Sequence, residues 1–371
     1  MIDRDLMDKA EAFLGKWLAK PRVDLPLLIA LLLIAVIGIL TQFSASAEDP
    51  TLILNQSLRL GLGFTVLWVF SRIPPPWFRS ITPWFFSFAL VLLVALLVIG
   101  EGRGAHRWLD LKIIRFQPSE LAKISLPMMV AWYFHTRALP PNWRMLFTVG
   151  AMIGVPAVLI AKQPDLGTAL LVASTGVFAV FLAGISWLRI LLISGGTLAA
   201  MPLLWMVMHE YQRNRVRMFL DPEADPLGNG WNIIQSKIAV GSGGLLGKGW
   251  LHSTQARLDF LPEHTTDFAF SVFSEEFGLI GVIGIILIYL FIIGRSLWIA
   301  ANARDTFSRL LAGSLAMTFF VYVMVNGGMV AGLLPVVGVP MPLVSYGGTS
   351  AVSLLAGFGI IMSIHAHRRR D

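Results

Sequence analysis

The sequence predicts an all-α, polytopic membrane protein with about ten transmembrane helices and a large extracytoplasmic loop between helices 7 and 8. Of its 371 residues, 56% are hydrophobic and only 14% are charged, whereas about a quarter of the residues of soluble domains are charged. Ten apolar stretches approach the length of about twenty residues that crosses about 30 Å of hydrocarbon. Because no soluble domain is visible, residues 1–371 are expected to form a single integral membrane domain.

The apolar stretches follow one another along the whole chain. They lie at Leu25–Phe43, Leu58–Phe70 with its flanks, Trp84–Ile99, Leu121–Tyr133, Leu146–Ala161, Leu166–Leu182, Ile190–Met208, Phe268–Ile293, Leu310–Val330 and Ala351–Ile364. Residues 209–266 form the large loop. The first stretch could belong to a signal peptide, because Ala45-Ser46-Ala47 resembles a cleavage site. Its length and the long leader of mixed charge favour an uncleaved span.

The distribution of basic residues predicts the orientation, since Lys and Arg concentrate in cytoplasmic connections. Placing the amino-terminal segment 1–24 in the cytoplasm also places there the Arg-bearing connection 294–309 and the basic tail 365–371. Both termini are therefore expected to be cytoplasmic. The net charge of +7 is divided among short connections, which argues against a nucleic-acid-binding face. The absence of cysteine excludes disulfides and thiol catalysis.

Two predicted outer loops carry basic residues against this rule. The large loop costs the topology little, because long loops translocate largely regardless of charge. The loop 101–117 is short, and it contains Arg103, Arg107, Lys112 and Arg115. A site for an anionic substrate would explain these charges, since Arg and Lys stabilise phosphate. Contact with lipid headgroups is the alternative.

Two motifs place acids at the beginning of predicted spans. Glu120 and Lys123 follow Pro118 and lie three residues apart, on one helical face. Charges inside a span are costly and tend to mark functional sites, although this pair could also simply neutralise itself. Asp165 follows Pro164 at another helix start, where a capping role is favoured over a functional one.

The stretch Leu258–Phe270, LDFLPEHTTDFAF, joins the polar loop to a very apolar helix and places Asp267 in the expected first turn of that helix. The helix dipole favours an ionised carboxylate there, whereas burial beside Phe268 and Phe270 favours the neutral form. Composition alone leaves a structural acid and a catalytic acid equally compatible with this position.

The glycine-rich stretch Gly241–Gly249 superficially resembles a nucleotide-binding loop. Ser242 stands where the first glycine of that motif belongs, and Gly249 stands where Ser or Thr binds magnesium. The sequence therefore predicts no nucleotide site here.

The stretch Leu334–Ser350 is too apolar for a free loop and too rich in proline for a helix. Such backbone survives at membrane depth only where protein or a cavity satisfies its polar groups. A partly buried re-entrant segment and a tight helical hairpin are both compatible with this composition.

Five ordered motifs of the chain resemble the SEDS family (shape, elongation, division and sporulation) of peptidoglycan glycosyltransferases. They are GAHRWLDL with FQPSELAK, QPDLGTA, NGWNIIQSKIAVGSGGLLGKGW, LDFLPEHTTDFAF with SEEFG, and LPVVGVPMPLVSYGGTS. The match is closer to the branch that acts in cell elongation than to the division-specific branch. The resemblance implies ten helices and polymerisation of lipid II outside the cytoplasmic membrane of a bacterium. It identifies Asp267 as the essential acid and Glu120 with Lys123 as a functional pair, and it matches motif positions at Arg107, Asp165, Gln235, Ser236 and Lys237.

The implied reaction requires a base for the acceptor hydroxyl and cations for the departing pyrophosphate. Asp267 is expected to be the base or a metal ligand, and magnesium or manganese would be compatible with it. The cations expected at the pyrophosphate are Lys123, Arg107, Arg213 and Lys248. The expected partners are a class B penicillin-binding protein transpeptidase and other membrane proteins of the elongation complex. A lipid II flippase and a non-catalytic membrane scaffold are the competing hypotheses.

Overall fold

Helices occupy all ten predicted stretches. The computed structural model describes residues 23–99, 108–110, 115–208, 210–226, 228 and 230–368, so most of the segment 1–24, Arg107 and the last three residues of the tail lie outside it. The helices of the ten stretches are α2 (Leu25–Ala45), α3 (Pro50–Arg72), α4 (Pro75–Ile99), α5 (Ser119–Phe134), α6 (Trp143–Ala161), α7 (Leu166–Leu182), α8 (Trp187–Val207), α12 (Ala269–Ala301), α13 (Thr306–Val330) and α14 (Gly348–Ala366). The prediction of a polytopic, all-helical fold is confirmed.

Seven of these helices are long and apolar enough to cross a membrane within the described residues, namely α2, α3, α4, α6, α12, α13 and α14. The helices α5 and α7 are shorter, with 16 and 17 residues. Two helices begin well before the predicted apolar stretches, α3 at Pro50 and α4 at Pro75. Asp49 caps α3 by accepting a hydrogen bond from Thr51 N, so a local cap sets this boundary rather than hydropathy.

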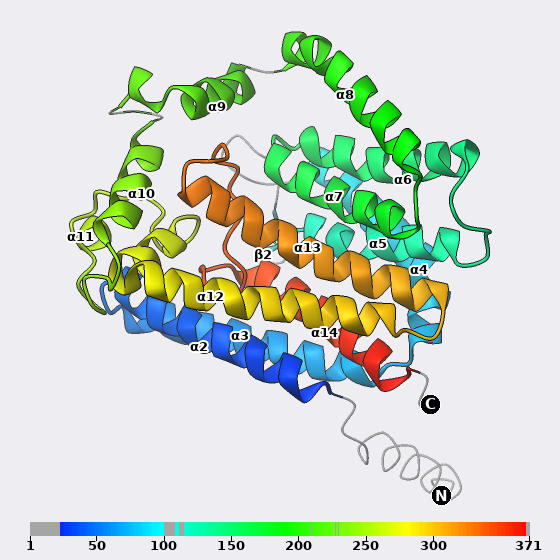
Figure 1. The fold of residues 1–371 in the computed structure, drawn as a ribbon, viewed down its shortest axis with the longest axis horizontal. Helices are drawn as coiled ribbons and strands as arrows, with labels where there is room; N and C mark the ends of the chain where they lie inside the picture. Colours follow the sequence, from blue (N-terminus) through cyan, green and yellow to red (C-terminus); the bar gives the residue numbers. More distant parts are fainter. Residues whose placement is uncertain are drawn as a thin grey trace, which may run out of the picture.

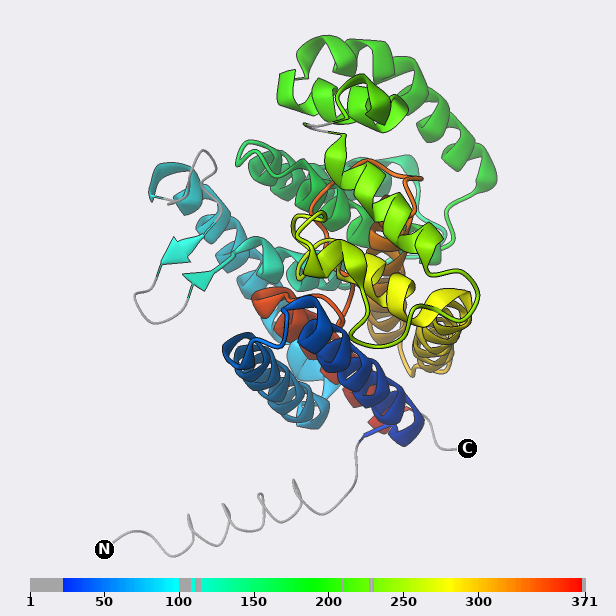
Figure 2. The same cartoon turned by 90° about the vertical axis from the view of Figure 1, so that its left-hand side faces the viewer.

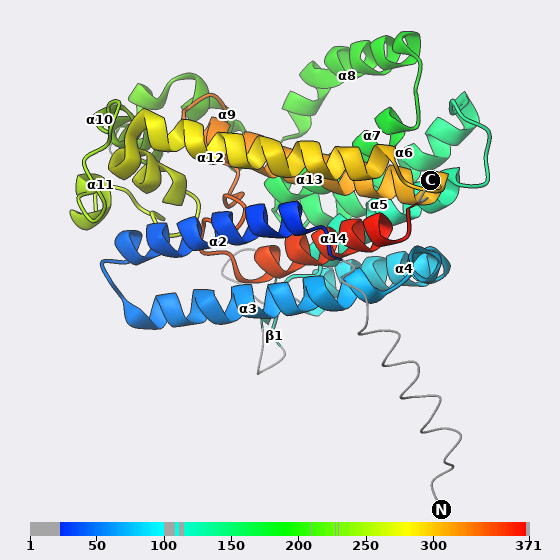
Figure 3. The same cartoon turned by 60° about the horizontal axis from the view of Figure 1, so that its bottom comes forward.

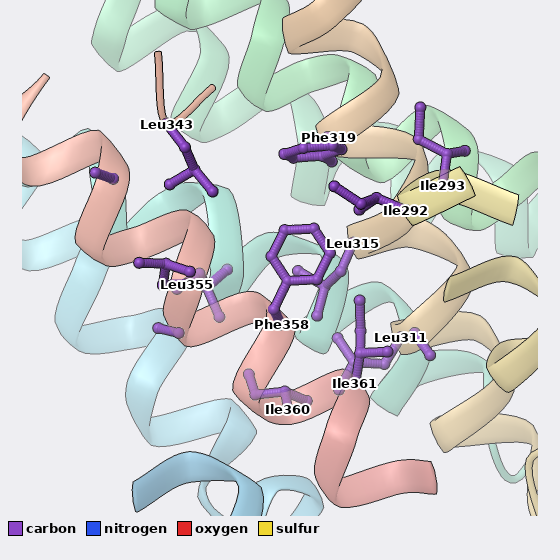
Figure 4. Close-up of a cluster of buried hydrophobic side chains, with 14 of the residues drawn as sticks. Ile292, Ile293, Leu311, Leu315, Phe319, Leu343, Leu355, Phe358, Ile360 and Ile361 are labelled. Carbon is purple, nitrogen blue, oxygen red and sulfur yellow. The ribbon is translucent and has the colours of Figure 1, made fainter. Parts of the chain in front are cut away.

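The long helices run side by side in layers, with α12 and α13 over α2 and α14, and with α3 and α4 beneath (Figures 1 and 3). The helix α14 packs along α3, and α12 packs against α13 and α2. Figure 2 shows α8 standing away from the other helices. Buried side chains of α12, α13 and α14 form much of the core (Figure 4), in which the rings of Phe319 and Phe358 meet edge to face at 5.0 Å.

The beginning of α2 lies beside α12 and beside the end of α14, on one side of the molecule. Arg295 of α12 donates two hydrogen bonds to Asp24, at 3.1 and 2.7 Å, and His365 Nε2 of α14 lies 3.4 Å from the same carboxylate. Burial raises the pKa of Asp24, but the hydrogen bonds from Arg295 and Leu27 N and the nearby positive charges outweigh it and hold this pKa below its ordinary value. These contacts hold the beginning of α2 against the ends of two later spans.

The predicted large loop contains helices of its own. These are α9 (Glu210–Leu220), the short 3-10 helix η1 (Pro222–Ala224), α10 (Trp231–Ser242) and α11 (Thr254–Arg257). They lie at the end of the bundle opposite the Asp24 contacts (Figure 1). A two-residue strand pair, β1 (Leu109–Asp110) with β2 (Arg115–Phe116), is the described part of the loop before α5.

The segment between α13 and α14 is non-helical and largely buried from Val339 to Ser345. Side chains of neighbouring helices satisfy its carbonyl groups: Gln42 Nε2 donates to Val344 O at 2.9 Å, and Tyr289 Oη donates to Pro342 O at 2.7 Å. The prediction of a partly buried, non-helical segment is confirmed, and the helical-hairpin alternative is wrong; we call residues 331–347 the re-entrant segment.

A candidate active site at the mouth of a long cavity

A cavity of about 1900 Å³ opens between α3, α4, α5, α14 and the re-entrant segment. Its two ends differ in chemistry. Toward the end of the bundle that carries α10, polar and charged side chains line it; toward the end that carries Asp24, its walls are apolar. The polar wall contains Arg59, Gln117, Glu120, Lys123, Asp165, Asp267, Tyr346 and Ser353, and the apolar wall contains Val66, Phe70, Ile73, Trp77, Phe78 and Ile360.

Asp267 lies on the polar wall, in a turn just before α12. The sequence predicted it in the first helical turn, but α12 begins at Ala269 with Phe268 as its N-cap, so that prediction was wrong by two residues. The turn closes on itself, because Phe268 N donates to Glu263 O at 3.1 Å. The consequence is that tertiary contacts, rather than the regular geometry of a helix, position the Asp267 backbone.

Two side-chain amides, those of Asn326 and Gln42, join this turn to the re-entrant segment, and Gln42 Nε2 donates to Thr265 O and to Val344 O, each at 2.9 Å. Asn326 Nδ2 of α13 donates to Asp267 O and to Val339 O, each at 2.8 Å. Tyr346 N donates to Thr265 O at 2.8 Å on the other side of the turn. The turn that carries Asp267 is therefore held by α2, by α13 and by the re-entrant segment.

Glu120 and Lys123 form the ion pair that their spacing predicted, with 2.7 Å between Oε1 and Nζ. Both side chains are buried, with 5% and 9% of their surface exposed. Ser353 of α14 donates to the other carboxylate oxygen at 2.6 Å, and Lys123 Nζ lies 5.1 Å from the centre of the Tyr322 ring. Because Ser353 belongs to α14 and Tyr322 to α13, the pair links α5 to both of these helices beside the cavity.

Asp165 is the N-cap of α7, as predicted, and its Oδ1 accepts from Thr168 N at 3.2 Å. Its Oδ2 accepts from Gln117 Nε2 at 3.3 Å, and the residue also lines the cavity. Capping therefore does not remove Asp165 from the site.

Arg59 was missed by the sequence reasoning. It lies on α3, as the second residue of the predicted apolar stretch Leu58–Phe70, and its guanidinium carbon lies 4.5 Å from the centre of the Tyr346 ring. Within the described residues it forms no ion pair with an acid, whereas Lys123, the other described cation on the cavity wall, is paired with Glu120. The signal was a lone arginine near the start of a predicted span, which the general cost of charge in membranes could have singled out.

Five residues predicted to bind substrate lie outside the cavity wall. Ser236 is buried, and its hydroxyl is hydrogen-bonded to Ser271 Oγ and Val330 O, at 2.9 and 2.8 Å. Lys248 is paired with the buried Glu275 at 2.6 Å. Gln235 lies buried beside Ser236 on α10, and Arg213 donates to two carbonyl groups near the end of α8. The structure therefore does not bring these residues to Asp267.

The fifth of them, Lys237, is exposed on α10, and its side chain lies across Gly332 at the end of α13. Arg107, the sixth predicted substrate-binding residue apart from Asp165, falls outside the described residues. A substrate role for either one remains a prediction from the motif.

The described residues hold no group of three or more His, Asp or Glu side chains that could bind a metal ion by themselves. Glu120 is engaged by Lys123 and Ser353. An ion at this site would combine the Asp267 carboxylate, or that of Asp165 on the same wall, with oxygen atoms of a bound substrate, an arrangement that magnesium commonly adopts with phosphates.

Comparisons with known proteins identify related chains. Residues 22–370 match the family model for cell cycle proteins of the FtsW, RodA and SpoVE type. The peptidoglycan glycosyltransferase MrdB of Escherichia coli strain K12 is 49% identical over 353 residues, which are 94% of this chain and 95% of that protein. A probable peptidoglycan glycosyltransferase FtsW of Trichlorobacter lovleyi is 38% identical, covering 92% of this chain and 93% of its own.

Solved structures resemble the whole fold. The crystal structure of the rod shape determining protein RodA of Thermus thermophilus matches with a TM-score of 0.72 and 29% identity, covering 96% of this chain and 100% of that one. A chain from a peptidoglycan synthase complex, described for its coordination of polymerization and crosslinking, matches with a TM-score of 0.81 and 32% identity, covering 94% and 99%.

Proposed function

The chain belongs to the FtsW, RodA and SpoVE family of cell cycle proteins, and from that premise we propose that it polymerises lipid II into glycan strands during cell elongation. It is a multi-pass membrane protein and a peptidoglycan glycosyltransferase. Its identity to MrdB, 49%, exceeds its identity to the FtsW relative, 38%. The elongation branch of the family is therefore favoured over the division branch.

One observation carries this proposal: an acid and an arginine lie at the polar mouth of a cavity whose depth is apolar. A lipid-linked sugar has the same two-part chemistry, with a charged pyrophosphate between a polar head and a hydrocarbon tail. Asp267 and Arg59 line the polar part, while Phe70 and Trp77 line the apolar part. The cavity can thus hold the sugar and pyrophosphate beside Asp267 while the tail lies among the helices.

In the proposed reaction, a hydroxyl oxygen of the acceptor sugar attacks the anomeric carbon of the donor. The bond from that carbon to the pyrophosphate oxygen breaks, its electron pair leaves with the lipid pyrophosphate, and the configuration inverts. Asp267 takes the hydroxyl proton as general base. Arg59 is placed to stabilise the developing charge on the pyrophosphate, because its planar guanidinium can donate two hydrogen bonds to phosphate oxygens.

Glu120 and Lys123 line the same polar wall of the cavity. Their mutual pairing and the hydrogen bond from Ser353 offset part of the desolvation cost of placing two ionisable groups inside the protein. Lys123 can turn part of its hydrogen bonding toward a bound pyrophosphate while Glu120 holds its position. Asp165 keeps the start of α7 in place and presents its carboxylate to the same space.

A divalent cation fits this donor set only if the substrate supplies some of its ligands, because the described residues contain no group of three His, Asp or Glu side chains that could bind it. Asp267 and pyrophosphate oxygens are hard ligands of the kind that magnesium and manganese prefer. When bound, such an ion would neutralise charge on the leaving group. The proton transfer assigned to Asp267 does not require it.

The proposed orientation places both termini in the cytoplasm, and the cavity mouth on the outer face of the bacterial cytoplasmic membrane. It is supported by the basic residues of the connections and tail, and by the meeting of Asp24, Arg295 and His365 on one side of the bundle. The proposed partner is a class B penicillin-binding protein transpeptidase. The match to a complex described for polymerization and crosslinking supports this partner.

A flippase would need polar groups accessible at both ends of the cavity. The described lining residues toward the Asp24 end are apolar, among them Ile73, Trp77 and Ile360. That pattern favours a site that works at one membrane face, as a polymerase requires.

The test is polymerisation of purified lipid II by the purified protein, with and without the class B partner, comparing the parent with Asp267→Asn. Asparagine keeps the shape of the side chain but cannot accept the proton, so turnover should fall by roughly 10²–10⁴-fold while the melting curve stays unchanged. Glu263→Gln is the matched control, because Glu263 is an exposed acid of the same turn that does not line the cavity. Near-normal polymerisation by a folded Asp267→Asn protein would remove Asp267 from the mechanism.

A further inference from the structure

The helix α12 is broken close to its beginning, at Gly278. This residue has φ 61° and ψ −165°, a combination that essentially only glycine adopts. An unbroken helix would join Leu279 N to Glu275 O and Ile280 N to Glu276 O. The break therefore leaves four backbone groups in need of other partners.

The glycine-rich turn after α10, residues 243–249, supplies all four. Lys248 N donates to Glu275 O and Gly249 N donates to Glu276 O, both at 3.0 Å. In the other direction, Leu279 N donates to Gly244 O at 2.9 Å and Ile280 N donates to Leu245 O at 3.1 Å. The turn is thus inserted between the two halves of α12.

Close backbone contact explains the glycines of this turn. A Cβ atom on Gly243 would lie 2.3 Å from Ser274 O, and one on Gly247 would lie 2.1 Å from Glu276 O. Gly247 also has a positive φ of 82°. The stretch that resembles a nucleotide-binding loop is therefore built to approach a helix backbone.

The turn lies at the depth of the membrane-spanning segments. The bonded residue Ile280 is fifteen residues, or roughly 22 Å of helix, from Arg295, which contacts Asp24 at the start of α2. That distance is shorter than the hydrocarbon thickness of about 30 Å. On the other side of the turn, Trp250 Nε1 donates to Leu40 O at 3.2 Å, and Leu40 lies within the membrane-spanning helix α2, before its end at Ala45.

The tip of the turn is apolar and points away from the protein. Leu245 is 68% exposed and Leu246 is 78% exposed. They continue the exposed apolar surface of α12, where Ile280 is 60% exposed and Ile283 is 48% exposed. Polar solvent is an unfavourable environment for such a surface, whereas lipid hydrocarbon is a suitable one.

We infer that residues 243–249 are a membrane-inserted turn, and that its tip, Leu245 and Leu246, is embedded among the acyl chains of the lipid leaflet on the Asp267 side. The bonds to α12 favour this insertion, since the carbonyl groups of Glu275 and Glu276 and the N–H groups of Leu279 and Ile280 all have partners and none of these four is left to face lipid. The turn thereby anchors the loop between α8 and α12 to the bilayer. The helix break that it bonds, at Gly278, is about ten residues after Asp267 in the chain.

The absence of cysteine from the chain allows a direct measurement of depth. A nitroxide label at Leu246→Cys, in the full-length protein reconstituted in phosphatidylethanolamine and phosphatidylglycerol vesicles, is compared by its collisions with oxygen and with a water-soluble nickel chelate. The references are Ile283→Cys on the exposed face of α12 and Glu223→Cys on η1. The oxygen-to-nickel ratio at residue 246 should equal that at residue 283 and exceed that at residue 223 several-fold.

Two outcomes would overturn the inference. A ratio like that at residue 223 would place the tip in water, and low collision rates with both reagents would show that protein, such as a second copy of the chain, covers it. Adding Gly247→Ala to the labelled Leu246→Cys protein should displace the turn and raise its nickel accessibility. Gly241→Ala is the matched control, because a Cβ there meets nothing within 4 Å; an equal change with both variants would contradict the insertion of the turn into the break.

Discussion

The buried pair of Glu120 and Lys123 permits the sharpest quantitative prediction. The side chains are only 5% and 9% exposed, and their charged atoms lie 2.7 Å apart. Removing one partner of such a pair strands the other charge, which typically costs about 3–5 kcal/mol of unfolding free energy. We therefore expect Glu120→Gln and Lys123→Met each to destabilise the protein within this range.

The double variant should cost less than the two single losses together. With both charges removed, neither is left uncompensated, and coupling between contacting residues typically amounts to about 0.5–3 kcal/mol. We expect a value in the upper half of that range, because the pair is buried. Reversible unfolding in mixed detergent micelles measures the stability, and lipid II polymerisation measures the function of the same four proteins.

Ser353→Ala is the internal control for this cycle. It removes the 2.6 Å hydrogen bond to Glu120 without removing a charge, so the loss should be about 1.5–3 kcal/mol. Strictly additive losses for Glu120→Gln and Lys123→Met would show that the two side chains act separately and would refute the argument. Recovery of stability without recovery of polymerisation in the double variant would show that the pair serves the reaction as well as the fold.

Three further predictions concern the mouth of the cavity, the Asp24 side and the topology. Arg59→Ala should lower polymerisation by about 10²-fold, and Arg59→Lys should restore only part of it because lysine lacks the planar fork; unchanged turnover in Arg59→Ala would exclude a role at the pyrophosphate. Because its folded-state pKa is lowered from 3.8, Asp24 should stabilise the protein above that pH and progressively less below it. Melting curves of parent and Asp24→Asn should therefore differ at pH 7 and converge in acid. A difference that grows in acid would contradict a lowered pKa of Asp24. Single cysteines at the exposed positions Glu223 and Ala301 should differ toward an impermeant thiol reagent in intact cells, with only the first reactive, and equal labelling would contradict the proposed orientation.

Hydropathy predicted the ten helices because each must present a long apolar surface to lipid, and that requirement is visible in one stretch of sequence at a time. It predicted the starts of α3 and α4 poorly. Residues near the start of α3, such as Asn55 and Gln56, have the composition of a connecting loop, yet Gln56 is fully buried and donates to Ser345 O. A partner almost three hundred residues away in the chain cannot be read from local composition.

The same limit applies to the site. The spacing of Glu120 and Lys123 was sufficient to predict their contact, because it is a contact within one helix. The stacking of Arg59 on Tyr346 joins α3 to the segment before α14, and neither stretch contains a local pattern that predicts this contact. The positions of Lys248 and Ser236 away from the cavity likewise depend on how α10 and its following turn pack against α12.

The amide of Asn326 has a consequence for any attempt to transplant this site. Because Asn326 Nδ2 donates both to Asp267 O and to Val339 O, the backbone that carries the carboxylate and the re-entrant segment beside it are fixed to the same side chain. A shift of one moves the other, so the two cannot be grafted or redesigned independently. Reaction rates can fall about 10²-fold for a misplacement of 1 Å, and a scaffold that copied Asp267 without Asn326 would lose that registration first.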